Sequence, residues 1–69
     1  MLNLHDIVTL KEDDLETGIR KGAEGTVVDI HGNGEAYTVE FFDRDGDTIE
    51  ASFDKEFTEN EIKAAFKRD

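Results

Sequence analysis

The chain has 69 residues, with 18 acidic residues against eight basic ones, which gives a formal net charge of −10. This length allows one domain with one small core, so we expect residues 1–69 to form a single domain. The acidic charge disfavours direct nucleic-acid binding, and the absence of cysteine excludes disulfides and thiolate sites. The sequence contains no run of about 18 apolar residues, so we expect no membrane-spanning helix.

The chain begins MLNLHDIV, which lacks the basic segment that opens a secretory signal peptide. A chain without cysteine also fits a reducing compartment. We therefore expect a cytoplasmic protein. Its charge either serves solubility alone or favours a basic protein partner.

The first predicted strand is Asp6–Leu10 (DIVTL), with Val8 and Leu10 facing the core. A polar, acidic segment, KEDDLETGIRKG, follows at residues 11–22. Thr17-Gly18 interrupts any helical pattern there, so we expect a long loop with Leu15 and Ile19 as its apolar anchors. Long loops between strands often bind ligands, although the charges here can also be merely solvated.

Three apolar runs between residues 22 and 53 alternate as strands of a meander do. Two glycine-bearing turns join them, HGNGE at residues 31–35 and DRDGD at residues 43–47. We expect Gly22 and Gly25 to introduce a turn and a bulge at the start of the first run. The expected inward residues are Thr26, Val28 and Ile30; Tyr37, Val39 and Phe41; and Ile49, Ala51 and Phe53.

Three apolar residues, Ile7, Val27 and Phe42, then point away from this predicted core. Either the long loop or the C-terminal tail covers them, or they form a modest apolar patch ringed by acidic residues.

The C-terminal segment FTENEIKAAFKRD allows two structures. Thr58 with Glu61 forms a capping box, and Phe57 with Ile62 a hydrophobic staple, which predicts at least one helical turn. Alternation then favours a short closing strand at Ile62–Phe66, with a C-terminal helix as the alternative.

The order of these elements is that of a small SH3-like barrel of about five antiparallel strands, with a helical turn or short helix near the C-terminus. The sequence resembles a family of small bacterial domains of unknown function, frequent in cyanobacteria. Its members carry D-x-V-x-L, [KR]-G-x-x-G-T-V-V, G-E-A-[FY]-x-V-E-F, D-x-x-G-x-T and L-x-x-x-[QE]-I motifs. The matching positions here are Asp6, Val8, Leu10, Lys21, Gly22, Gly25, Thr26, Val27, Val28, Gly34, Glu35, Ala36, Tyr37, Val39, Glu40, Phe41, Asp43, Gly46, Thr48, Phe57, Glu61 and Ile62.

The resemblance implies the barrel and no chemistry. Relative to the family, Ser52–Glu56 reads as an insertion, and the tail Lys63–Asp69 is more charged than a typical last strand.

No arrangement of residues predicts catalysis, a cofactor or a metal site. Asp43, Asp45, Asp47 and Glu50 lack the glycine and glutamate spacing of an EF-hand loop, so an acidic hairpin turn explains them better. His5 and His31 without a third ligand make a poor zinc site.

We therefore expect a non-enzymatic protein-binding module that uses the acidic loop and the neighbouring hairpin turn. The candidate residues are Glu12, Asp13, Asp14, Glu16, Phe42, Asp43 and Asp45. The expected partner is a protein with a basic or basic-rimmed apolar surface, and neither nucleic acid nor a membrane is expected. The alternatives are an inhibitor or antitoxin-like protein that blocks a basic nucleic-acid-binding partner, and an accessory subunit of an enzyme complex.

Overall fold

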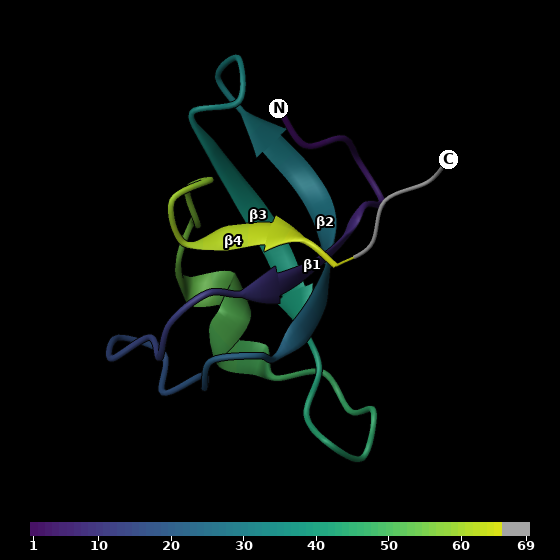
Figure 1. Ribbon diagram of the computed structural model, residues 1–69, viewed down its shortest axis with the longest axis vertical. Coiled ribbons are helices and arrows are strands. Elements are labelled where there is room, and N and C mark those ends of the chain that lie inside the picture. The colour runs from purple at the N-terminus through teal and green to yellow at the C-terminus, as the bar shows by residue number, and fades with distance from the viewer. Residues whose placement is uncertain (66–69) are drawn as a thin grey trace.

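The computed structural model describes residues 1–65 and is mainly β (Figure 1). Its strands are β1 (Ile7–Leu10), β2 (Glu24–His31), β3 (Ala36–Phe41) and β4 (Ile62–Ala64). They form one antiparallel sheet in the order β3-β2-β1-β4. A single 3-10 helix, η1 (Glu50–Asp54), lies between β3 and β4 in the chain. None of the helices in this described part is long and apolar enough to cross a membrane.

The sheet curls around its core, and its outer strand β3 is linked back to the C-terminal segment. Tyr37 and Phe57 exchange two backbone hydrogen bonds of 2.7 Å. Phe57 leads through a short turn into β4, which pairs with β1 on the other edge of the sheet. The Phe57 ring packs edge-on against Phe41, with centroids 5.1 Å apart. The two edges of the sheet are therefore tied together around one apolar core.

Side chains from every strand fill this core. The alternation predicted for β1 and β3 is confirmed, because Val8, Leu10, Tyr37, Val39 and Phe41 are all buried. Within residues 1–65, the buried apolar residues are Leu2, Val8, Leu10, Ile19, Val27, Tyr37, Val39, Phe41, Phe57 and Ile62.

The inward face predicted for the first part of β2 is wrong. Val27 is fully buried, whereas Val28 is 40% exposed. The reason is a β-bulge: Val27 pairs with Val39, but Asp29 pairs with the adjacent Thr38, so Val28 is an extra residue without a partner. Beyond the bulge, Ile30 again packs against the core, as predicted. A bulge in this strand was expected near Gly22 or Gly25, and it lies at Val28.

Gly25 has a packing role instead. A Cβ atom at this position would lie 2.7 Å from a methyl carbon of Val39 and 2.9 Å from the carbonyl oxygen of Glu40. Contacts this short are repulsive, so glycine allows the β2 backbone to approach the Val39 side chain and the β3 backbone closely.

The third apolar run does not form a strand, so the sheet has four strands where about five were expected. Only an isolated bridge between Phe42 and Thr48 remains of the expected pairing, and the chain then enters η1. The buried hydroxyl of Ser52 accepts the backbone N–H of Phe41, which occupies a donor at the edge of β3. Glu, Ala and Asp in this run also have weak strand preference. As a result Phe53, expected in the core, is 49% exposed.

The C-terminal segment follows the first of the two structures expected from its sequence. The backbone N–H of Thr58 donates to the Glu61 carboxylate at 3.0 Å, and Glu61 N–H donates to the Thr58 carbonyl at 2.9 Å. Phe57 and Ile62 on either side of this turn are buried. The closing strand is confirmed over Ile62–Ala64, where the alternative of a helix is wrong. Phe66, its expected last residue, lies outside the described residues.

Candidate functional site

The long loop between β1 and β2 has a defined structure. Its base is closed by hydrogen bonds from Leu10 N–H to the Ala23 carbonyl and from Gly22 N–H to the Leu10 carbonyl. Gly18, with a φ of 77°, turns the chain back so that Ile19 enters the core. Ile19 is thus an anchor of the loop, as expected. The prediction that Leu15 is the other anchor is wrong, since its side chain is 94% exposed.

Asp14 is buried, whereas the other acidic residues of the loop are exposed. Its carboxylate is 2.5 Å from the Lys55 ammonium and accepts hydrogen bonds from the backbone and hydroxyl of Thr17. Lys55 also contacts Glu61 at 2.7 Å, and its ammonium lies 5.2 Å from the centroid of the Phe57 ring. These contacts connect the loop, the segment after η1 and the turn before β4.

The electrostatics of this cluster favour the charged forms. Burial raises the pKa of Asp14 and of Glu61, but hydrogen bonds from Lys55 and from Thr17 or Thr58 outweigh it and hold both pKa values below the ordinary range. Hydrogen bonds to Asp14 and Glu61 raise the pKa of Lys55. Asp14 therefore stabilises the fold, and in this conformation its carboxylate is not presented to a partner.

The other predicted segments meet at an open groove of about 700 Å³ between the long loop and the hairpin that follows β3. Ile19, Ala23, Phe42 and Ile49 supply its apolar lining. Asp13, Arg20, Lys21, Asp43 and Arg44 supply its charged lining. A second hollow shares Gly22, Ala23, Phe42, Asp43 and Arg44 with the first and adds Glu24 and Gly46, so the two form one continuous groove.

Three of the predicted residues, Asp13, Phe42 and Asp43, thus lie together in this groove. The remaining ones, Glu12, Glu16 and Asp45, are exposed on the same loop and hairpin outside its lining.

Most charges that line the groove already have partners. Arg20 lies 3.6 Å from the Asp13 carboxylate, which also accepts the backbone N–H of Lys21. The Lys21 ammonium lies 4.0 Å from Glu12. Within residues 1–65, Arg44 and Glu24 have no ion pair.

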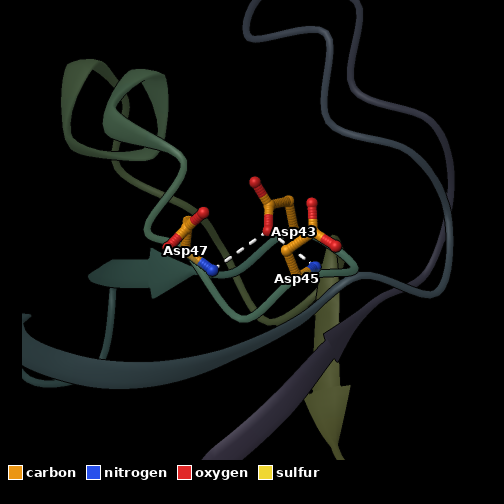
Figure 2. Close-up of side chains that lie close together, drawn as sticks. All are labelled: Asp43, Asp45 and Asp47. Atoms are coloured by element: carbon orange, nitrogen blue, oxygen red, sulfur yellow. Dashed lines mark hydrogen bonds between the residues drawn. The ribbon is translucent and has the colours of Figure 1, made fainter.

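The acidic hairpin turn is shown in Figure 2. One oxygen of Asp43 accepts the backbone N–H groups of Asp45 at 2.9 Å and of Asp47 at 3.0 Å. Gly46, with a φ of 86°, completes the turn. Carboxylate oxygens of the three exposed aspartates can lie within 4.8 Å of one another, a spacing that could hold a cation. The hydrogen bonds of Asp43 already explain why an aspartate opens this turn.

The two histidines lie in different settings. The Nε2 atom of His31 lies 2.7 Å from the Thr38 hydroxyl and 3.8 Å from the Glu56 carboxylate. His5 adopts a φ of 71° before β1, and its backbone N–H donates to the Val27 carbonyl. In the part of the chain that the structure describes, neither belongs to a cluster of three possible metal ligands.

Sequence reasoning missed the basic residues of the groove. Eight basic residues occur in the chain, and three of them, Arg20, Lys21 and Arg44, line this one feature. A signal was present, because Arg20-Lys21 directly precedes Gly22, and Arg44 lies inside the hairpin turn, so basic residues mark both segments that were expected to bind.

Comparison with known proteins gives a match to a protein family. The family model for "Domain of unknown function (DUF4926)" matches residues 4–52, which include β1, the long loop, β2, β3 and the acidic hairpin. No curated protein and no solved structure matches the chain significantly.

Proposed function

This chain belongs to the family described as a domain of unknown function (DUF4926), and we propose that it is a non-enzymatic protein-binding module whose groove takes a segment of its partner. The observation that carries the proposal is the convergence of the long loop and the acidic hairpin on one continuous groove. The proposal includes a cytoplasmic, bacterial setting and an SH3-like barrel. The curled sheet and the backbone bridge between Tyr37 and Phe57 support the barrel.

The shape of the groove supports binding of a peptide segment. It is open and continues into a second hollow, and its apolar lining of Ile19, Ala23, Phe42 and Ile49 is accompanied by charged side chains. Apolar contact at the centre with polar residues around it is the usual anatomy of a protein interface. Phe42 is the aromatic residue of this lining, and aromatic anchors commonly contribute most of the binding energy.

The charge of the domain supports a partner with a basic or basic-rimmed surface. Glu12, Glu16 and Asp45 are exposed on the two segments that flank the groove. A net charge of −10 attracts a basic surface over long range and repels the phosphates of nucleic acid. We expect this attraction to raise the association rate and to weaken as salt is added.

Selection from a random 12-residue peptide library displayed on phage tests the proposal. We expect enriched peptides to shift the amide resonances of residues 18–23 and 42–44 in nuclear magnetic resonance titrations. Phe42→Ala should weaken peptide binding about tenfold, because truncating a hot-spot aromatic residue removes more than about 1 kcal/mol.

Phe53→Ala is the matched control. Phe53 is also partly exposed, but it lies on η1 and does not line the groove. Phe53→Ala should leave the affinity for the selected peptides unchanged. Thermal unfolding of both variants checks that they fold. Failure to enrich any peptide, shifts confined to another face, or equal losses in the two variants would contradict the proposal.

A further inference from the structure

The groove has a charge balance unlike that of the rest of the protein. Acidic residues outnumber basic ones by 18 to eight in the chain. The groove between the loop and the hairpin is instead balanced, because Arg20, Lys21 and Arg44 line it together with Asp13, Asp43 and Glu24. A partner that matched only the overall charge of the protein would bring basic groups to the three cations of this lining.

Of these three cations, Arg44 is the one that forms no ion pair within residues 1–65. Arg20 lies beside Asp13, and Lys21 beside Glu12. Asp43, next to Arg44 in the chain, directs one carboxylate oxygen to backbone N–H groups within the hairpin. No carboxylate in residues 1–65 lies within ion-pair distance of Arg44.

We propose that the partner segment in this groove carries a carboxylate that pairs with Arg44, next to an apolar side chain that packs on Phe42 and Ile49. The inference rests on the proposed function and specifies its ligand: an extended peptide with an acidic residue beside an apolar one, in a partner whose wider surface is basic. Arginine suits this role, because its planar guanidinium group can donate two parallel hydrogen bonds to one carboxylate.

The position of Arg44 supports this pairing. Arg44 lines both hollows, as Phe42 does, so a segment that packs on Phe42 passes close to the guanidinium group. Apolar groups beside the pair exclude part of the surrounding water, which strengthens the pair relative to one in open solvent. The hairpin that carries Arg44 is held in shape by the Asp43 hydrogen bonds, so binding orders little new backbone.

Glu24 provides an internal control. It lines the second hollow at the start of β2, is exposed, and like Arg44 has no ion pair within residues 1–65. Arg44→Gln and Glu24→Gln therefore each remove one unpaired charge from the same groove, with opposite signs. Because neither residue is buried, both variants should fold, and their unfolding midpoints should stay close to that of the unchanged protein.

The test uses the same random 12-residue peptide library, with affinities measured by fluorescence anisotropy on the 69-residue protein. We expect enriched peptides to place Asp or Glu beside an apolar residue. Arg44→Gln should then weaken their binding about tenfold, while Glu24→Gln should leave it unchanged or strengthen it. Arg44→Glu should lose binding, and replacing the peptide carboxylate by Lys should restore part of it.

The outcomes separate this inference from the proposed function. Peptides that bind the groove without an acidic preference, or equal effects of Arg44→Gln and Glu24→Gln, would overturn the inference and leave the binding module intact. A library that yields no peptide for the groove would overturn both.

Discussion

The Lys55 ammonium lies 2.5 Å from the Asp14 carboxylate, although 41 residues separate the two in the chain. Lys55 also contacts Glu61 at 2.7 Å, and the exposed fractions of the Lys55 and Asp14 side chains are 14% and 8%. Through this one ammonium group the long loop, the segment after η1 and the turn before β4 are held together. A protein of this size has a small core, so such a link matters for its stability.

Lys55→Met tests this link. The substitution keeps the apolar stem but leaves the carboxylates of Asp14 and Glu61 close together without a cation. Breaking a buried pair in this way typically costs about 3 kcal/mol or more, and we expect the free energy of unfolding in urea to fall by about that amount.

Lys63→Met is its control, because Lys63 is exposed on β4. This variant should change the free energy of unfolding by less than about 0.5 kcal/mol. If both substitutions changed the free energy of unfolding by the same amount, the contacts of Lys55 would contribute nothing to stability beyond its positive charge.

The same cluster predicts how stability depends on pH. The folded pKa values of Asp14 and Glu61 lie below their ordinary values of 3.8 and 4.5. A lowered folded pKa contributes stability that is present above the unfolded value and is lost as pH falls through the folded value. The contribution should therefore be complete above about pH 5 and decline below about pH 4.

Urea unfolding between pH 2.5 and 7 measures this dependence. Loss of net negative charge in acid relieves repulsion elsewhere in the protein, so the informative quantity is the difference between the unchanged protein and Asp14→Asn. We expect this difference to be largest near neutral pH and to shrink below about pH 4. A difference that stays constant over the range would contradict the assigned role of Asp14.

The bulge in β2 predicts opposite outcomes for two adjacent valines. Val27→Ala removes two methyl groups from a fully buried side chain, and we expect the free energy of unfolding to fall by about 2–3 kcal/mol. Val28→Ala removes the same atoms from a side chain that is 40% exposed, so its cost should stay below about 1 kcal/mol. A larger loss for Val28→Ala than for Val27→Ala would contradict the bulge and support the uninterrupted alternation expected from the sequence.

This pair of valines also shows where sequence reasoning succeeds and where it stops. In β3 the alternation of Tyr37, Val39 and Phe41 continues without interruption, so one inward residue predicts the others. In β2 two apolar β-branched residues stand side by side, and either can face the core. Val27 faces the core because of how β2 pairs with β3 around the bulge and because β2 lies close to β3 at Gly25. Neither feature is visible in the local sequence pattern.

The candidate site divides in the same way. The long loop and the hairpin were predictable as segments, because glycines and acidic residues mark both as turns and loops. The separate roles of Asp13 and Asp14 were not predictable, since these residues are adjacent and chemically identical, and the Lys55 ammonium that pairs with Asp14 comes from far along the chain. The loss of the third strand likewise depends on the tertiary hydrogen bond between Phe41 and Ser52.

The acidic hairpin allows a last prediction, which separates a turn from a cation site. If Asp43 serves the turn through the oxygen that accepts the Asp45 and Asp47 N–H groups, Asp43→Asn should retain stability, because the amide oxygen can accept the same bonds. Asp43→Ala should cost about 1 kcal/mol of unfolding free energy, as loss of a local side-chain to backbone bond usually does. Urea unfolding in the presence of a chelator measures both, and equal losses in the two variants would show that the charge of Asp43 matters more than its hydrogen bonds.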